Sequence, residues 1–389
     1  MKKFFMLVCF LLCFLIVCYS SLPISAKLSD SVPTALDLKL ECKSAILIEA
    51  KTGKVLYEQN ADEALPPASV TKVMTLLLVM EAIEEGKLKY DDILVASANA
   101  GSMGGSQIYL EEGEEMSVED LLKSVIIASA NDAAVVLAER ISGTEEAFVE
   151  LMNKKAQSLG MSNTTFENTN GLDDTVQRHL TSARDIAIMS RELIKYPKIT
   201  EYSSIWMDTI RNGEFGLTNT NRLVRFYKGA TGLKTGSTSK AGFCISATAQ
   251  RDGMSLIAVI MGAPTRDVRN AAAVSLLDYG FSNYTLFSRS GETIESMRVK
   301  SGTQGSVSVK YGDFSCVLPR REAANVSFKI SIPESLSAPL KKGDVIGEVV
   351  YSVGDERIGK VDVIVDTEVK KMTFGAMFME FFKIIAGIF

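Results

Sequence analysis

One stretch of the chain, from Val70 to Ile83, is apolar on nearly every face that a helix would present. Such a helix has to be covered on all sides, which predicts a large core with other elements packed around it. The stretch ends at Glu84-Glu85-Gly86, where the glycine stands in a common stop position. A core of this size fits a chain of 389 residues, whose length favours two or three domains.

Strand-forming runs lie both before and after the helical part of the chain. Two of them surround the turn Ala50-Lys51-Thr52-Gly53, and two more surround Arg251-Asp252-Gly253, which predicts two hairpins. The strands are expected at Ala45–Ile48, Val55–Tyr57, Phe243–Ala249 and Ser255–Met261, and further helices at Val118–Ile141, Thr181–Ile194 and Val268–Tyr279. This order implies one sheet whose outer strands are far apart in the sequence.

The pattern changes near Tyr284 to short alternating runs broken by Gly, Pro and Asp. Alternation of this kind is typical of strands with one buried face. The runs include Val307–Val309, Val326–Ile332, Val345–Tyr351 and Lys360–Val365. A small all-β domain is therefore expected over residues 285–366.

The last segment, residues 367–389, is rich in Phe, Met and Ile. On a helical wheel Glu380, Lys383 and Gly387 share one narrow face, and the remainder is apolar. A membrane-spanning helix would place both charges near the middle of the bilayer, at a cost of roughly 2.5–3.5 kcal/mol each. A helix lying in the interface leaves them in water. We expect an amphipathic membrane anchor, with a spanning helix or a helix docked on the protein as alternatives.

The first 26 residues have the pattern of a secretory signal peptide. Lys2 and Lys3 precede an uninterrupted apolar run from Phe4 to Cys18, and Ile24-Ser25-Ala26 offers a small residue for cleavage. The apolar run is shorter than the roughly 20 residues that span a bilayer, which disfavours an uncleaved membrane helix. We expect a secreted protein that is attached to the outer face of the cytoplasmic membrane.

Composition disfavours several classes of function. Net charge is −5, and no basic stripe with interleaved aromatic residues appears, so nucleic acid is not an expected partner. The chain contains one histidine, His179, whereas metal hydrolases usually need several ligands at set spacing. After signal removal Cys42, Cys244 and Cys316 remain, which is not a disulfide framework or a zinc motif. We expect no metal and no cofactor.

Ser69-Val70-Thr71-Lys72 is the first segment that suggests chemistry. Ser69 and Lys72 are three residues apart and share one face of a helix. The prolines before Ser69 place it in the first turn, where backbone N–H groups are free to donate to an anion. A nucleophilic serine needs a base, and Lys72 is the local candidate if its pKa falls from about 10.4 towards neutrality. A helix cap followed by a surface lysine is the plain alternative.

Two further segments extend the pattern. Ser129-Ala130-Asn131 interrupts an apolar helical stretch, either as a functional turn or as an ordinary cap between helices. Lys234-Thr235-Gly236-Ser237 lies in a glycine-rich run before the strand at Phe243, and glycines let another backbone approach closely. A phosphate-binding loop is disfavoured there because Tyr227 occupies the position of its first glycine.

The order and spacing of the three segments resemble those of the penicillin-binding proteins and serine β-lactamases. Further stretches are similar to the low-molecular-weight D-alanyl-D-alanine carboxypeptidases, serine peptidase family S11. They are Pro67–Lys72, Asn168–Leu172, His179–Asp185, Asn219–Asn221 and Lys234–Gly242. The resemblance covers nearly the whole mature chain, including the order of signal, catalytic domain, β domain and terminal amphipathic helix.

The resemblance implies catalytic roles for specific residues. Ser69 would be acylated by the penultimate D-alanine of a peptidoglycan pentapeptide stem, releasing the terminal D-alanine. Lys72 would be the base, kept neutral in part by Lys234. Ser129 would relay protons between Lys72 and the leaving amine, and Asn131 would hold the substrate amide. β-Lactams would act as covalent inhibitors.

It also implies how the substrate would be bound. Lys234 and Thr235 would hold the terminal carboxylate, and Gly236 would allow close approach of the peptide. The N–H groups of Ser69 and Ser237 would form the oxyanion hole, where losing one donor costs about 10²–10³ in rate.

The fold implied is the β-lactamase/transpeptidase-like α/β sandwich, an antiparallel sheet flanked by helices, at residues 27–284. A serine β-lactamase is the nearest alternative, but the segment after Gly171 has no clear E-x-x-L-N deacylation loop. A catalytically silent penicillin- or wall-binding protein is another, which the three intact motifs disfavour. A Ser-His-Asp triad using His179 is disfavoured because no G-x-S-x-G elbow exists. His179 is expected to pack or support a loop, and Cys244 to lie in a strand core.

Overall fold

The structure is a computed structural model that describes residues 38–174 and 176–385, except the side chains of Glu295, Glu380, Lys383 and Ile384. The predicted signal peptide, residues 1–26, and the first residues of the predicted catalytic domain lie outside this range.

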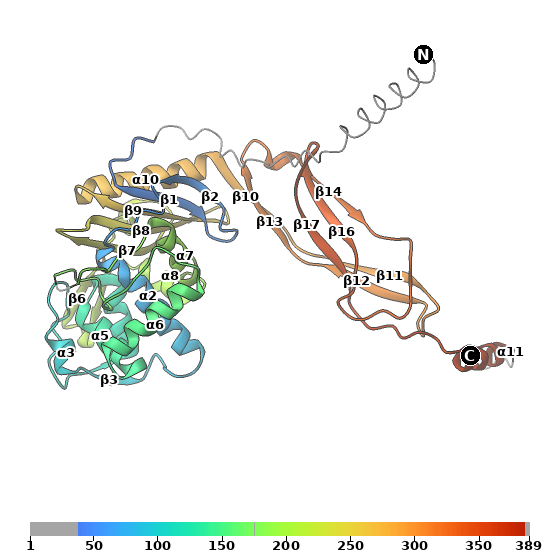
Figure 1. The fold of residues 1–389 in the computed structure, drawn as a ribbon, viewed down its shortest axis with the longest axis horizontal. Coiled ribbons are helices and arrows are strands. Elements are labelled where there is room, and N and C mark those ends of the chain that lie inside the picture. The colour runs from blue at the N-terminus through green and yellow to red at the C-terminus, as the bar shows by residue number, and fades with distance from the viewer. Residues whose placement is uncertain (1–37, 175, 386–389) are drawn as a thin grey trace, which may run out of the picture. The chain divides into compact units, whose positions relative to one another are not determined.

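A five-stranded antiparallel sheet organises the first part of the described chain (Figure 1). The strand order is β2 (Val55–Gln59), β1 (Ser44–Glu49), β9 (Met254–Ala263), β8 (Gly242–Arg251) and β7 (Ala230–Thr238). Both predicted hairpins are present, and the first pairs with the second through β1 and β9. The prediction of one sheet that joins distant segments is confirmed.

Helices cover both faces of this sheet, as the sandwich fold requires. Alternate residues of β1 point to opposite sides: Ala45 and Leu47 belong to the core beneath α10 (Arg266–Asn283), and Ile46 and Ile48 to the larger core on the other side. The elements of that second layer are η1 (Ala68–Thr71), α2 (Lys72–Glu84), α3 (Ala98–Gly101), α4 (Val118–Lys123), η2 (Ser124–Ala128), α5 (Asn131–Ser142), α6 (Glu145–Ser158), α7 (Ala183–Leu193) and α8 (Pro197–Ser203).

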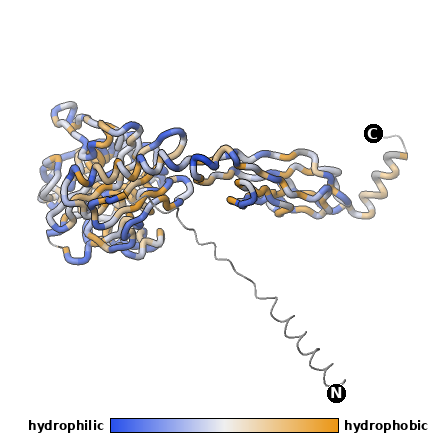
Figure 2. Tube along the Cα trace, turned by 90° about the horizontal axis from the view of Figure 1, so that it is seen from above, coloured by the Kyte–Doolittle hydropathy of each residue, from blue (hydrophilic) through white to orange (hydrophobic). Residues whose placement is uncertain are grey.

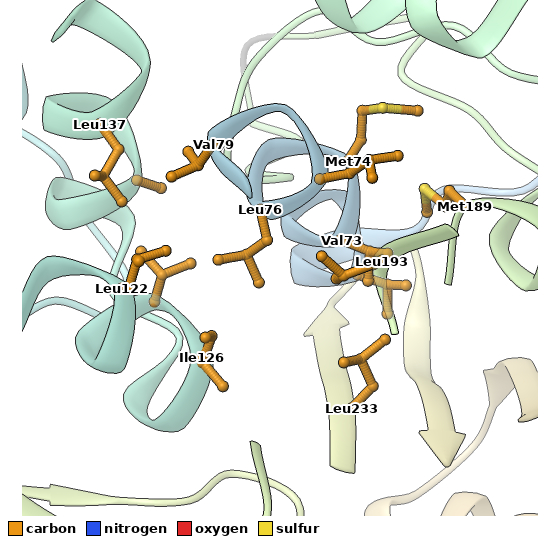
Figure 3. Close-up of a cluster of buried hydrophobic side chains, with 14 of the residues drawn as sticks. Val73, Met74, Leu76, Val79, Leu122, Ile126, Leu137, Met189, Leu193 and Leu233 are labelled. Carbon is orange, nitrogen blue, oxygen red and sulfur yellow. The ribbon is translucent and has the colours of Figure 1, made fainter. Parts of the chain in front are cut away.

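Helix α2 is the buried helix expected from the apolar stretch. Figure 3 shows its side chains meeting partners in several directions, among them Leu122 of α4, Leu193 of α7 and Leu233 of β7. Its residues Val73, Met74, Leu76, Leu77 and Val79 are all nearly inaccessible to solvent. Because it is covered all round, α2 gives the serine and lysine at its start a rigid base.

The predicted helix at Val118–Ile141 is divided in the structure. After α4 the chain forms one π-helical turn, η2, and Ser129 then takes a left-handed conformation with φ 66°. Helix α5 begins two residues later at Asn131. π-turns and strained residues concentrate at functional sites, and Ser129 and Asn131 lie at this break between the helices.

Smaller elements close the edges of this part of the chain. Two hairpins are formed by β3 (Ile93–Val95) with β4 (Glu115–Ser117), and by β5 (Met207–Ile210) with β6 (Phe215–Thr218). The short elements η3 (Arg211–Gly213) and α9 (Leu223–Phe226) complete it. Cys244 is fully buried on β8, which confirms it as a strand core residue.

The chain after α10 is β-rich, as predicted. Strands β10 (Tyr284–Arg289) and β13 (Phe314–Pro319) pair with each other. Six others form a sheet in the order β14 (Val326–Ser331), β16 (Val345–Val353), β17 (Glu356–Val365), β12 (Ser306–Tyr311), β11 (Thr293–Lys300) and β15 (Ser335–Ser337), and η4 covers Ala323–Asn325. Their core includes Val309, Tyr351 and Val363.

The described chain ends in helix α11 (Phe374–Ile385), drawn almost entirely in hydrophobic colours in Figure 2. Large apolar side chains are exposed along it, including Phe374, Phe378 and Phe382, which are 77%, 51% and 51% accessible. Within the described residues, no helix has the length and apolar character needed to cross a bilayer.

Candidate active site

The nucleophile candidate sits at the start of the buried helix. Ser69 lies in the 3₁₀ turn η1 and Lys72 is the first residue of α2, so the two are one turn apart. The Lys72 Nζ atom is 2.9 Å from Ser69 Oγ. Ser69 is only partly buried, whereas Lys72 is completely buried. The hydroxyl is therefore reachable by a ligand while its neighbouring amine is shielded from water.

The three partners of Lys72 reveal which proton arrangement the site favours. Besides Ser69, Nζ contacts Asn131 Oδ1 at 2.6 Å and the backbone carbonyl of Asn170 at 2.8 Å. The Asn131 Nδ2 atom donates to the Gly104 carbonyl, which fixes Oδ1 towards the lysine. Two partners can thus only accept. A neutral amine has two N–H donors for them and one lone pair left, which can accept the Ser69 O–H.

Burial supports the neutral form of this lysine. Removal from water lowers the pKa of Lys72 well below its usual range, and the nearby charge of Lys234 lowers it further. The negative charge of Asp132 acts in the opposite direction but is the smallest of the three causes. A lysine in this setting is suited to act as a base.

Ser129 is brought to Lys234 across the site. Lys234 Nζ donates to Ser129 Oγ at 2.8 Å and to the Thr235 carbonyl at 2.9 Å. Burial lowers the pKa of Lys234 to about 7, with a second contribution from the charge of Arg269. The structure therefore gathers the residues of all three predicted motifs, with Asn131 bonded to Lys72 and Ser129 to Lys234.

Strand β7 runs directly beside the nucleophile turn. A Cβ atom on Gly236 would lie 2.7 Å from the Ser69 backbone nitrogen and 2.9 Å from the Pro67 carbonyl oxygen, so only glycine fits there. Thr235 Oγ1 donates to Thr220 Oγ1 at 2.7 Å, while Ser237 is exposed. The strand edge thus presents polar groups next to Ser69.

A cavity of about 600 Å³ opens over these groups. Its lining includes Ser69, Ser129, Thr235, Gly236 and Ser237. Four arginines that the sequence patterns did not single out also line it: Arg222, Arg225, Arg266 and Arg269. Arginine spacing along the chain carries no signal for such a cluster, because two of these residues precede β7 and two belong to α10.

Other contributors were also missed. The loop at Asn168–Leu172 was noted for its resemblance but given no role; it supplies the Asn170 carbonyl that holds Lys72. Gly171 has φ +87°, and a Cβ on it would lie 1.9 Å from the Ala68 carbonyl oxygen. Asp132 is buried and accepts hydrogen bonds from the backbone N–H groups of Ile108 and Leu110. A lone acid directly after Asn131 in an apolar helix could have signalled that role.

His179 has the structural role predicted for it. The Glu167 backbone N–H donates to its Nδ1 atom at 3.0 Å, and its Nε2 atom lies 2.7 Å from Thr71 Oγ1, which itself donates to the Ala68 carbonyl. Nε2 therefore carries the proton. Burial lowers the pKa of His179 to about 4, so the ring is neutral at physiological pH. It supports the turn that carries Ser69 and makes no triad with the serine.

Comparison with known proteins gives a consistent result. A family model described as D-alanyl-D-alanine carboxypeptidase matches residues 30–265, and one described as the C-terminal domain of penicillin-binding protein 5 matches residues 281–371. The D-alanyl-D-alanine carboxypeptidase DacF of Bacillus subtilis is 44% identical over 346 residues, which are 87% of this chain and 88% of the relative.

Two solved structures extend the comparison. Penicillin-binding protein 5 from Haemophilus influenzae is 34% identical with a TM-score of 0.75, over 85% of this chain and 98% of that one. Penicillin-binding protein D2 from Listeria monocytogenes, solved in the ampicillin-bound form, is 34% identical with a TM-score of 0.58, over 63% of this chain and 99% of that one.

Proposed function

Because this chain belongs to the D-alanyl-D-alanine carboxypeptidase family and is a serine-type carboxypeptidase of the penicillin-binding protein group, we propose that Ser69 is the residue it acylates and that Lys72 is the activating base. The observation that carries this proposal is the contact of 2.9 Å between Lys72 Nζ and Ser69 Oγ, made by a lysine whose other two partners can only accept.

Acylation follows from this arrangement. Lys72 takes the Ser69 proton as Oγ attacks the carbonyl carbon of the penultimate D-alanine. The C–N bond breaks, an ester forms on Ser69, and the nitrogen of the terminal D-alanine leaves with a proton. Ser129 Oγ, which lies beside Lys234, gives its own proton to the amine and takes up the proton that Lys72 received from Ser69. Water then hydrolyses the ester and restores Ser69.

Binding of the substrate uses strand β7. Lys234 and Thr235 hold the terminal carboxylate, and Gly236 lets the peptide lie along the strand. The N–H groups of Ser69 and Ser237 bind the developing oxyanion. Asn131 keeps one Nδ2 hydrogen beyond the one given to Gly104, and this hydrogen is available to a carbonyl of the substrate amide.

The same site is proposed to react with β-lactams; the Listeria relative was solved in an ampicillin-bound form. A mass shift equal to one ampicillin, located on the peptide that contains Ser69, is the expected result of incubation, alongside release of D-alanine from a pentapeptide. The adduct should outlast many turnovers of peptide. Rapid hydrolysis of ampicillin without a lasting adduct would identify a β-lactamase instead, and absence of both reactions would identify a silent binding protein.

We also propose the cellular setting of the enzyme. Residues 1–26 are a cleaved signal peptide, 27–284 the catalytic domain, 285–366 the β-rich domain and 367–389 the anchor. The enzyme is held on the outer face of the cytoplasmic membrane and trims peptidoglycan stems. The ring centroids of Phe374 and Phe378 are 6.3 Å apart, and those of Phe378 and Phe382 are 4.7 Å apart, so the three rings form an exposed aromatic row along α11. This row supports the proposed membrane anchor.

Deletion of residues 370–389 is expected to move the protein from the membrane pellet to the soluble fraction of cells, with unchanged activity on soluble peptide. Burying each large apolar side chain in the interface stabilises binding by roughly 1.5–3 kcal/mol, and the deletion removes all of those on α11. Western blotting of fractionated cells measures the distribution.

Two variants, one of them a control, test the anchor without shortening the chain. The triple change Phe374→Ser, Phe378→Ser, Phe382→Ser should also release the protein, whereas Phe328→Ser, which removes an exposed phenylalanine of β14, should not. Persistent pelleting of the truncated protein would place the anchor elsewhere. Loss of peptide activity would make α11 part of the catalytic fold.

A further inference from the structure

The catalytic cavity carries more positive charge than one terminal carboxylate requires. Arg222, Arg225, Arg266 and Arg269 line it together, and no Asp or Glu is among the described residues that line it. Lys234, which is buried and donates to Ser129 of the lining, adds another basic group next to the cavity. The chain as a whole has a net charge of −5, so this concentration is local and not a property of the surface in general.

The arginines come from α10, which packs against β8, and from α9 and the residue before it, where α9 packs against β7, the strand that carries Lys234. Arg269 Nη1 is 3.4 Å from the Cys244 carbonyl, and Cys244 pairs with Gly236 across β7 and β8. Arg266 is one turn earlier on α10, a spacing that puts both on one helix face. Thr220, bonded to Thr235, leads into the segment that carries Arg222 and Arg225.

This side of the cavity is where the leaving amino acid is proposed to bind, because Lys234 and Thr235 hold its carboxylate. Asn131, which is proposed to hold the amide of the acyl donor, is hydrogen-bonded to Gly104 and Lys72 instead. The positive charge of the four arginines therefore lies near the terminal residue of the substrate and not near the rest of the stem peptide.

Three of the four arginines are exposed and available to a ligand: Arg222, Arg225 and Arg266. In the described part of the chain none of these three forms a salt bridge with a carboxylate; the acidic neighbour on α10, Asp267, is exposed and does not line the cavity. The Arg225 guanidinium lies over the rings of Trp206 and Phe226, 5.4 Å from each centroid. These contacts hold the cation in place without neutralising it.

Resting on the proposed function, we propose that the leaving-group side of the cavity binds a second carboxylate, so that this enzyme also removes acidic D-amino acids, such as D-glutamate, from peptides ending in D-alanyl-D-glutamate. The reaction is the same: Ser69 Oγ bonds to the D-alanine carbonyl carbon, the C–N bond breaks, D-glutamate leaves with the proton, and water hydrolyses the ester. Arg225 and Arg266 meet the side-chain carboxylate, since paired N–H donors of arginine match the two oxygens of a carboxylate.

The experiment compares kcat/KM for diacetyl-L-lysyl-D-alanyl peptides ending in D-glutamate, D-glutamine or D-alanine, at low ionic strength. D-Glutamine has the shape of D-glutamate without its charge. We expect D-glutamate to be favoured over D-glutamine by about tenfold, mainly through KM, because charge-assisted hydrogen bonds are stronger than neutral ones. The preference should shrink as salt is added.

Variants connect the preference to the two arginines. The double change Arg225→Gln, Arg266→Gln should make the two peptides nearly equal, Arg225→Lys, Arg266→Lys should keep most of the preference, and Arg140→Gln, an exposed arginine on α5, should change nothing. No preference for D-glutamate, or one that survives in the glutamine double variant, would overturn the inference. Failure to release D-alanine from the standard peptide would instead overturn the proposed function.

Discussion

Replacing Ser69 with alanine is expected to reduce D-alanine release by at least about 10³-fold and to abolish the covalent β-lactam adduct, because in the described residues Ser69 is the one whose hydroxyl is hydrogen-bonded to Lys72. Ser129 Oγ, the other serine of the cluster, is engaged with Lys234 and does not contact Lys72 in any hydrogen bond of the described residues. Intact-protein mass spectrometry after incubation with ampicillin, together with an assay of free D-alanine, measures both losses.

The matched control is Ser158→Ala, which changes an exposed serine at the end of α6. This variant should keep the adduct and full activity. Circular dichroism and a melting curve should show that Ser69→Ala is folded like the parent, since the substitution removes one oxygen from a partly buried position. An unchanged mass shift in Ser69→Ala would show that another residue is acylated and would refute the assignment of the nucleophile.

Replacing Lys72 with glutamine is expected to slow acylation by about 10³-fold, within the range that general bases contribute. Glutamine can still donate to the Asn170 carbonyl, but it has no lone pair basic enough to take the Ser69 proton. The rate of adduct formation with ampicillin, followed by quenched mass spectrometry, measures acylation directly. Lys154→Gln, an exposed lysine on α6, should leave this rate unchanged.

The pH dependence provides a second measurement of the same lysine. The pKa of Lys72 is lowered, so the neutral and reactive form persists to lower pH than for an exposed lysine. Acylation by the parent enzyme should fall only as pH drops through that lowered pKa, when Nζ becomes protonated. This acid limb should be absent from the residual activity of Lys72→Gln. If the residual acylation rate of the variant fell at the same pH as that of the parent, the titrating group would be one other than Lys72.

Local spacing in the sequence determined a large part of the fold and of the site. The apolar periodicity of Val70–Ile83 predicted a helix buried on all sides, and the runs around Ala50–Gly53 and Arg251–Gly253 predicted hairpins. The interval between Ser69 and Lys72 placed a hydroxyl and an amine one helical turn apart. These features depend on residues close in the chain, whose geometry follows directly from helix and strand repeats.

Contacts between distant segments were decided by the tertiary structure. The sequence assigned the three motifs to one site only through resemblance. The hydrogen bonds within the site were not predicted: Ser129 pairs with Lys234, and Asn131 pairs with Lys72. The Asn170 carbonyl accepts one N–H of Lys72 and so helps to direct the nitrogen lone pair towards Ser69. It is a backbone group and has no sequence signature of its own.

The electrostatic character of the cavity has the same origin. Arg225 reaches it from α9 and Arg266 from α10, although nothing in their local sequence marks either as a ligand-binding residue. Likewise, the lowered pKa of Lys72 arises from burial beneath several packed elements and from the charge of Lys234, which is distant in the chain. Spacing along the chain encodes which side chains share a local face, but burial and charge depend on which faces are packed together.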